Sequence, residues 1–324
     1  MCQYPWKMFT TSKDMFIALD ADPQGVIERV AQDYELHPRF IRYYIDHLCQ
    51  AHRDNPQAHA YFDSEFGLFK RTIATLQHLS DSLGIVVETA SVLDVGCNSG
   101  HSLRAFEKLG AGKVVGIEYD PQRYATSQYM LECHSSSAKV CHASILDDNV
   151  IDQCGGGNFD LITCFDVIEH LPTPDKAIAN FSQLLRPGGR VILTIANRYY
   201  PDIMLCEPHY GLPGMTLLER DDAKIYHDLV RDSEYDVFNW FTRNALEKLF
   251  RRHGFEVIPE AQIKARHIRS EVFNALKALW FADYPSASIR NKVRRSVCRV
   301  GILNACVRNA TDFLAAQYSP SQRN

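Results

Sequence analysis

Residues 91–119, SVLDVGCNSGHSLRAFEKLGAGKVVGIEY, decide the fold of this 324-residue chain. They begin with a short apolar run, pass through a glycine-containing turn into a segment with helical spacing, and end in a second apolar run. A strand, a crossover helix and a second strand of these lengths form a right-handed βαβ unit. The stretch therefore predicts two parallel strands joined by a helix.

The same alternation continues along the chain. After a helix at 121–134 we expect strands at 139–144, 159–167 and 190–197, with a helix at 174–185 before the last strand. Strands separated by helices of about 10–15 residues indicate an open parallel sheet with both faces covered. The sequence thus predicts an α/β fold.

Two long segments depart from this alternation. Residues 1–88 keep apolar residues at helical spacing and are predicted to form a helical N-terminal cover. The core would then span 89–263, and within it residues 198–240 are irregular and rich in Tyr, Pro, Asp and Glu. A long irregular segment inside a domain is typical of a binding loop, so we interpret 198–240 as a substrate lid.

The C-terminal part has a different character. Residues 264–308 are basic and amphipathic and predict a helical insertion. Residues 309–324 are expected to supply a last edge strand, at 312–318, and a tail. This strand is predicted to pair antiparallel with one at 255–263, so that the parallel sheet has one antiparallel edge strand.

Composition excludes several classes of protein. Hydrophobic residues make up 46% and charged residues 23% of the chain, which is ordinary for a globular protein. No uninterrupted apolar stretch approaches the roughly 18–20 residues of a membrane span, and the first residues lack the apolar core of a secretory signal. The ten cysteines form no CxxC pair and indicate reduced thiols. We therefore expect a cytoplasmic protein.

Charge is unevenly distributed. The net charge is −4, but residues 264–308 carry ten Lys and Arg against Glu271 and Asp283, a net +8, which leaves −12 elsewhere. The acidic remainder makes a nucleic-acid partner unlikely as a general ligand. The basic segment is either a helical cap with solvated charges or a peripheral contact for an anionic membrane or an amphiphilic, phosphorylated substrate. The oligomeric state stays open.

The turn at 94–100, DVGCNSG, is predicted to bind a ligand. Ligands of open α/β sheets bind outside the carboxyl ends of the strands, and Gly96, Asn98 and Gly100 tolerate the positive φ that a tight turn needs. Glu118 ends the second strand, where its carboxylate can accept hydrogen bonds from both hydroxyls of a ribose.

A dinucleotide fold would use the same acid. Its G-x-G-x-x-G fingerprint fails here at two of three positions, which are Asn98 and His101. Asp94 would repel a pyrophosphate but attract an ammonium group. The turn therefore favours a cationic amino-acid nucleoside over NAD.

Four stretches, in this order and spacing, carry a resemblance. VLDVGCNSG (92–100), GIEYDP (116–121), FDLITCFDVIEHLPTPDKAI (159–178) and LLRPGGRVILTIAN (184–197) resemble a class I S-adenosylmethionine-dependent methyltransferase. The resemblance extends over 85–263 and implies a Rossmann-like fold with S-adenosylmethionine (SAM) as the cofactor. The cofactor half is also similar to ubiquinone-type O-methyltransferases.

The resemblance implies a set of cofactor-binding residues. Asp94 and the backbone of Gly96 and Gly100 would hold the methionine end, Glu118 the ribose and Tyr119 one side of the adenine. Two positions depart from the family pattern, because Asn98 replaces the middle glycine and Ala143 replaces the polar residue after the third strand. The full set is Asp94, Gly96, Cys97, Asn98, Gly100, Glu118, Tyr119, Ser144, Ile145, Phe165 and Asp166.

Two histidines are candidate catalytic bases. Methyl transfer is an in-line displacement that depends on positioning, and a hydroxyl nucleophile must also lose its proton. His170 follows the strand at 159–167, and His209 lies in the lid. A structural role is the alternative for His170, because the sequence EH after the fourth strand is common in this fold.

A metal site is a further alternative. Asp166, Glu169 and His170 share one face of a helical turn, and with His209 they offer carboxylate and imidazole ligands that suit Mg²⁺ or Mn²⁺. The set is similar to that of metal-dependent 2′-O-methyltransferases of small RNAs and of some quinone O-methyltransferases. Asp at the first position and a different histidine spacing depart from those families, so we assign no metal.

Together these features predict an enzyme that methylates a hydroxyl oxygen of a small or lipid-linked acceptor, such as a phenol, a quinol or a sugar. N-methylation of a small amine, RNA 2′-O-methylation and cofactor binding without catalysis stay open. The acidic balance argues against RNA, and the two histidines favour oxygen over a neutral amine, which needs no deprotonation.

Overall fold

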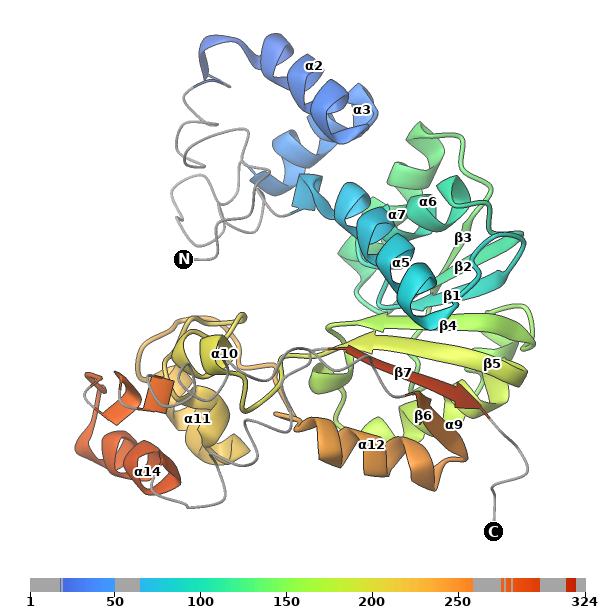
Figure 1. Cartoon of the computed structure of the whole chain (residues 1–324). Coiled ribbons are helices and arrows are strands. Elements are labelled where there is room, and N and C mark those ends of the chain that lie inside the picture. The colour runs from blue at the N-terminus through green and yellow to red at the C-terminus, as the bar shows by residue number, and fades with distance from the viewer. Residues whose placement is uncertain are drawn as a thin grey trace. The chain divides into compact units, whose positions relative to one another are not determined.

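A computed structural model gives the arrangement of the chain (Figure 1). It places the chain in two units, Met1–Ser144 and Ile145–Asn324. The residues that it describes are 18, 20–49, 65–258, 275–276, 278–280, 282–297 and 313–318.

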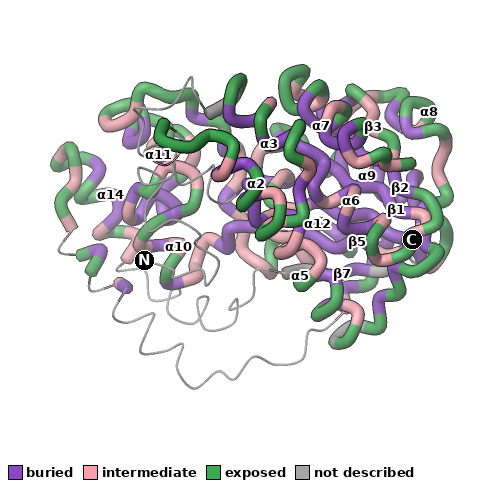
Figure 2. Tube along the Cα trace, turned by 90° about the horizontal axis from the view of Figure 1, so that it is seen from above, coloured by how far each residue is buried: buried purple, intermediate pink, exposed green. Residues whose placement is uncertain are grey.

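The strands of the first unit are short, parallel and buried. β1 (Ser91–Val95) pairs in parallel with β2 (Lys113–Glu118), and β2 pairs in parallel with β3 (Lys139–His142). The tube along β1 and β2 is mostly in the colour of buried residues (Figure 2). The crossover helices are α6 (His101–Lys108) and α7 (Pro121–Cys133). This is the predicted βαβ pattern.

The described residues before β1 contain several helices, in the region where the sequence predicts a helical cover. Their helices are α2 (Pro23–Tyr34), α3 (Pro38–Tyr44), a π-helical turn (Ile45–Cys49) and α5 (Leu68–Leu83). Val26, Phe40 and Ile41 pack with Met130 of α7 in one apolar cluster. Apolar burial therefore fixes α2 and α3 on α7, while the boundaries of the predicted domains stay a prediction.

The second unit continues the alternation. Its first elements are α8 (Val150–Gln153), β4 (Phe159–Phe165), a 3₁₀ turn (Ile168–His170) and α9 (Pro174–Leu184). β5 (Leu185–Thr194) follows and pairs in parallel with β4. β5 begins five residues earlier than predicted, because the Pro187–Gly189 turn lies inside the strand as an irregularity of the register. With these strands the fold is Rossmann-like, which confirms the predicted class.

The last strands correct one detail of the prediction. β7 (Phe313–Tyr318) pairs antiparallel with β6 (Phe255–Ile258), as expected, but it also pairs antiparallel with β5. β7 is therefore inserted between β5 and β6, and β6 is the edge strand among the described residues. Ala316 is fully buried, which the sheet interior requires. Residues 259–263 of the predicted strand lie outside the described residues.

The lid is more regular than predicted. Residues 198–240 contain α10 (Pro201–Leu205), a 3₁₀ turn (Met215–Leu217) and α11 (Arg220–Asp228). With α14 (Ala287–Val297) these helices form a group apart from α9 and α12 (Arg243–Arg252), which pack along the strands (Figure 1). The group has its own apolar core, which includes Met204, Met215, Leu217, Ile289 and Val293. These helices are too short to show a clear helical periodicity of apolar residues, so the segment looks irregular in the sequence.

α14 lies within the predicted basic insertion. It carries Arg290, Lys292, Arg294 and Arg295, and Lys292 pairs with Asp222 of α11. Arg294 stacks over the ring of the exposed Trp280. Residues 264–274 and 298–312 are outside the part of the chain that the structure describes, so the peripheral membrane contact stays a prediction. Among the described residues, every helix is too short or too polar to span a bilayer.

Six of the ten cysteines are described as free thiols, namely Cys97, Cys133, Cys141, Cys154, Cys164 and Cys206. The reduced state of the whole set stays a prediction.

The position of β7 can be tested at Ala316. An Ala316→Asp substitution places an unpaired carboxylate inside the sheet, and we expect the free energy of unfolding to fall by about 3 kcal/mol or more. Urea denaturation followed by circular dichroism measures this. Leu229→Asp, at a position that is 54% exposed, is the matched control and should cost about 0.5 kcal/mol or less. Equal effects would contradict a buried central position for β7.

Candidate active site

The turn between β1 and α6 has the backbone that the predicted ligand site needs. Gly96, Asn98 and Gly100 have φ angles of +74°, +50° and +84°. Asn is among the few non-glycine residues that tolerate this region, so Asn98 fills the place of the missing glycine. The N–H groups of Gly96 and Cys97 both donate to the carbonyl of Ile117, at 2.9 and 3.1 Å, and fasten the turn to β2.

Glu118 lies at the end of β2, and both of its carboxylate oxygens accept hydrogen bonds while they retain further lone pairs. Its Oε2 accepts the Asn98 N–H at 2.9 Å, and its Oε1 accepts the Asp120 N–H at 3.0 Å. The side chain is buried. Each carboxylate oxygen has two lone-pair sites, so the group can still accept two hydroxyl donors. Asp94 is also buried and accepts a hydrogen bond from the Ser102 hydroxyl.

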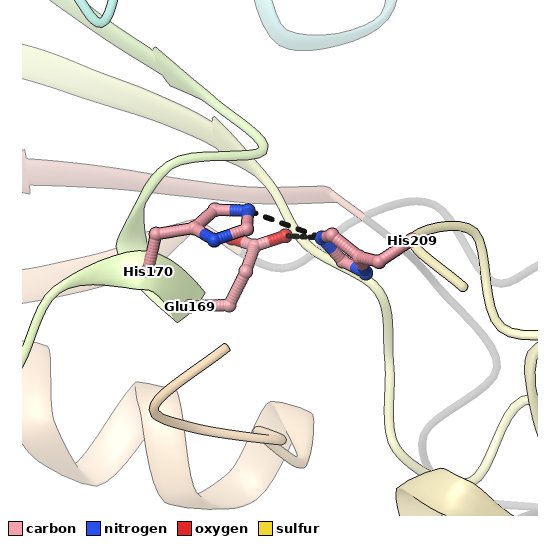
Figure 3. A group of neighbouring side chains, drawn as sticks. All are labelled: Glu169, His170 and His209. Carbon is pink, nitrogen blue, oxygen red and sulfur yellow. Dashed lines mark hydrogen bonds and ion pairs between the residues drawn. The ribbon is translucent and has the colours of Figure 1, made fainter. Parts of the chain in front are cut away.

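In the second unit, three side chains converge after β4. The Nε2 atoms of His170 and His209 lie 3.1 Å apart, and His209 Nε2 lies 3.8 Å from Glu169 Oε1 (Figure 3). One ligand atom from each residue falls within a group 4.8 Å across. We call Glu169, His170 and His209 the Glu–His–His cluster.

Glu169 is the most unusual member. It is buried, and within the described residues neither of its oxygens makes a hydrogen bond. Burial, with a smaller contribution from the negative charge of Asp166, raises the pKa of Glu169 to about 7. A buried carboxylate without a hydrogen bond is costly, and such groups are concentrated at functional sites.

Each histidine is oriented by a carboxylate at its other nitrogen. His170 Nδ1 lies 3.3 Å from Asp236 Oδ2, and His209 Nδ1 lies 3.5 Å from Glu207 Oε2. Burial lowers the pKa of His170, but the hydrogen bond and charge of Asp236 outweigh it and raise the pKa overall. Asp236 thus occupies His170 Nδ1, whereas His209 Nδ1 makes no hydrogen bond among the described residues, and the two Nε2 atoms face each other.

Glu207 also shapes the segment that presents His209. Its buried carboxylate accepts the backbone N–H groups of His209, Tyr210 and Leu212 at 2.8, 2.8 and 3.1 Å. A carboxylate that accepts several backbone N–H groups fixes a turn much as a cap fixes a helix end. Glu207 therefore holds His209 in place.

The other end of the lid is tied to the 3₁₀ turn itself. The N–H groups of Phe238 and Asn239 donate to the carbonyl of Glu169, at 2.9 and 3.0 Å. The Tyr210 hydroxyl donates to Asp236 Oδ1 at 2.5 Å. Backbone and side-chain hydrogen bonds thus tie residues 198–240 to the turn that carries Glu169 and His170.

Comparison with known proteins shows the family. A model of the methyltransferase domain matches residues 67–260, more than half of the chain. The chain belongs to this methyltransferase domain family. S-adenosylmethionine is therefore its cofactor, as the sequence predicted.

The methyltransferase is similar to two ubiquinone biosynthesis O-methyltransferases. It is 34% identical over 110 residues to that of Xanthomonas oryzae pv. oryzae and 32% identical over 106 residues to that of Methylococcus capsulatus. These alignments cover 34% and 33% of this chain and 44% and 43% of the relatives, so the chain spans less than half the length of either. Magnesium protoporphyrin IX methyltransferase from Synechocystis, solved with bound S-adenosylhomocysteine, superposes with a TM-score of 0.45 at 15% identity and covers 78% of this chain and 85% of that one.

The residues predicted for the cofactor in the first unit fit SAM. The turn has the required positive φ angles, and Glu118 retains acceptor capacity for the ribose. Tyr119 is 72% exposed and offers a free ring face beside Glu118. The Cys97 thiol is buried, and burial raises its pKa well above the usual range, so this residue can contribute only backbone and packing. Ser144 is half-buried.

The predicted cofactor residues of the second unit differ in exposure. Ile145 is buried and Phe165 half-buried, whereas Asp166 is exposed. Asp166 has a φ of +54° and accepts a hydrogen bond from the Thr194 hydroxyl at 2.8 Å. The roles of these residues toward SAM stay predictions.

The structure brings together three of the four residues that the sequence offers as metal ligands. His170 and His209 come together with Glu169, whereas Asp166 lies outside the group. Two imidazoles whose second nitrogens contact carboxylates form a pattern typical of metal ligands. The cluster therefore fits a divalent cation with three protein ligands.

Sequence reasoning missed Glu207 and Asp236, which orient the two histidines. Glu207 stands two residues before His209, a spacing at which a carboxylate can accept the N–H of His209. That local pattern could have identified it. Asp236 is far from His170 in the sequence, and only the fold brings them together.

The turn can be tested at Asn98. We expect Asn98→Gly to bind S-adenosylhomocysteine (SAH) within about threefold of the unmodified protein, because glycine adopts positive φ freely. Asn98→Val should weaken SAH about tenfold or more, since a β-branched residue is strained at this φ. Calorimetric titration measures both affinities. Equal affinities for the two variants would contradict the assignment of the turn to the cofactor.

The role of Glu207 can be tested separately. Glu207→Ala leaves three backbone donors without their charged acceptor, and we expect the free energy of unfolding to fall by roughly 3 kcal/mol. Glu219→Ala removes an exposed glutamate whose ion pair with Arg198 spans 3.5 Å, and it should cost about 0.5 kcal/mol or less. Denaturant titration of the two variants checks this. A loss in Glu207→Ala no larger than the control would show that Glu207 does not anchor the segment.

Proposed function

We propose that this methyltransferase transfers the methyl group of SAM to a hydroxyl oxygen of a small or lipid-linked acceptor, such as a phenol, a quinol or a sugar. The observation that carries the proposal is the Glu–His–His cluster, which gathers two imidazole nitrogens and a buried carboxylate. A hydroxyl is a poor nucleophile until it loses its proton. The cluster supplies groups able to remove it.

The histidines have the geometry of a base with orienting partners. Asp236 contacts Nδ1 of His170, so His170 presents Nε2 as the working nitrogen, and His209 turns its own Nε2 toward the same point. In the reaction the O–H bond breaks toward a histidine Nε2, and the oxygen forms a bond to the methyl carbon as the carbon–sulfur bond breaks. SAM, when bound, supplies the electrophilic methyl group and leaves as SAH.

The same side chains support a second way to activate the oxygen. Glu169, His170 and His209 would hold a divalent cation, which lowers the pKa of a hydroxyl that binds to it. The acceptor and its chemistry would be the same. We keep both routes, and the experiment below separates them.

The similar proteins favour oxygen as the methylated atom. The relatives at 34% and 32% identity are named ubiquinone biosynthesis O-methyltransferases. Their likeness covers the cofactor half of the chain, so it supports the type of reaction more than the acceptor. RNA 2′-O-methylation would also use a cation, but the net charge of −4 does not favour a polyanion.

Methyl transfer to a panel of catechols, quinols, sugars and amines tests this proposal. We expect transfer to a hydroxyl acceptor, and a loss of about 100-fold or more in kcat for His170→Gln and His209→Gln. SAH affinity should stay unchanged in both, because neither histidine is assigned to the cofactor. His253→Gln, at a histidine that pairs with Asp175, is the matched control with full activity.

Metal removal distinguishes the two routes. If a cation activates the oxygen, treatment with a chelator abolishes activity and Mg²⁺ or Mn²⁺ restores it. If a histidine alone is the base, the chelator has no effect. Methylation of amines only, with full activity in both histidine variants, would overturn the proposal.

A further inference from the structure

A buried ion pair adjoins the cofactor turn in the first unit. Glu65 lies shortly before α5, and His101 is the first residue of α6, directly after Gly100. Glu65 Oε1 and His101 Nε2 are 3.3 Å apart, and the side chains are only 1% and 2% exposed. The ring of Phe40 packs edge-on against His101. Such a pair is costly to bury, and apolar residues of similar size are often as stable.

The pair adjoins the turn. Glu65 contacts His101, the residue that directly follows Gly100, and among the described residues neither side chain makes a hydrogen bond. Burial raises the pKa of Glu65, but His101 and the hydroxyl of Ser99 outweigh it and hold the pKa below its usual value. Ser99 is buried as well.

Attachment of the N-terminal helices to α6 does not explain this pair. Glu35 pairs with Lys108 of α6 and, at 3.8 Å, with Lys70 of α5. The guanidinium of Arg104 stacks over the ring of Phe69, 4.3 Å from its centroid. These partly exposed contacts already join α5 and α6. What distinguishes Glu65 is its buried contact with His101.

We propose that Glu65 and His101 are positioning residues for the amino-acid end of SAM. The pair holds the Ser99–His101 part of the turn in the conformation whose backbone receives the methionine portion of the cofactor. The adenosine portion depends on Glu118, which the pair does not contact through any described hydrogen bond. This inference concerns the cofactor and goes beyond the choice of acceptor, so it can fail or hold independently of O-methylation.

Two ligands distinguish a specific effect on the amino-acid end of SAM from a general loosening of the binding site. SAH has the amino-acid end, whereas 5′-methylthioadenosine keeps the adenosine and sulfur but lacks that end. We expect Glu65→Ala and His101→Ala each to weaken SAH about tenfold or more. Both variants should bind 5′-methylthioadenosine within about twofold of the unmodified protein. Calorimetric titration of the full chain measures all of these affinities.

A double variant and two controls complete the test. Glu65→Ala/His101→Ala should weaken SAH no more than either single change, because both remove one interaction. Glu35→Ala, which removes the exposed link between the same helices, should leave SAH affinity within about twofold. Glu65→Gln keeps the size of the side chain and an acceptor oxygen, and it should recover part of the SAH affinity.

Three results would overturn the inference. They are unchanged SAH affinity in Glu65→Gln and His101→Ala, equal weakening of SAH and 5′-methylthioadenosine, and the same loss in Glu35→Ala. If circular dichroism shows that Glu65→Ala does not fold, Glu65→Gln and His101→Ala decide the question. Glu65→Gln keeps the volume of the side chain, and His101→Ala removes the other member of the pair.

Discussion

Parallel strands buried on both faces leave little room for charged side chains along their length, and this constraint governs where chemistry can occur in the chain. Val92 and Leu93 of β1 and Ile162 and Cys164 of β4 are fully buried. Charged groups therefore gather mainly where a strand ends. Asp94 and Glu118 lie at or near the ends of β1 and β2, and the segment that carries the Glu–His–His cluster follows β4.

Where the chain leaves a strand it adopts positive φ angles, and carboxylates stabilise this part of the chain by accepting hydrogen bonds from backbone N–H groups. Positive φ angles occur at Gly96, Asn98 and Gly100 after β1 and at Asp166 after β4. Glu118 accepts the N–H of Asn98, and in the lid Glu207 accepts three backbone N–H groups. Charged acceptors make strong hydrogen bonds to N–H groups, so each carboxylate holds an irregular segment that apolar packing could not.

The sequence alone predicts the features that depend on residues close together along the chain. The strands from β1 to β5, the glycine turn and the acid of Glu118 follow from local pattern and spacing. The antiparallel pairing of β7 with β6 was also predicted, although these strands are far apart in the sequence. The insertion of β7 between β5 and β6 depends on contacts across more than a hundred residues, for which the sequence pattern holds no signal. The lid helices were missed because they are short.

The site was predictable to the same degree. His170 and His209 were candidates because of their place after a strand and in the lid, but their meeting depends on Asp236 and Glu207, which no helical or strand period connects to them. Asp166 was grouped with Glu169 and His170 on the assumption of one helical turn. Its positive φ and its bond to Thr194 remove it from that face.

The facing nitrogens of the cluster limit how it can work. With Nδ1 of His170 directed at Asp236, a neutral His170 presents a lone pair at Nε2. A neutral His209 with its proton on Nε2 donates that proton to His170 across 3.1 Å, because no hydrogen bond holds a proton on His209 Nδ1 among the described residues. That proton, however, uses the lone pair that a base needs, so base catalysis requires the hydrogen bond between the histidines to open. A divalent cation would take the place of the proton without that step, and it would also supply the partner that buried Glu169 lacks among the described residues. The two routes therefore place different demands on the cluster: a histidine base must first break the contact with its neighbour, whereas a cation would bind between the nitrogens as they stand.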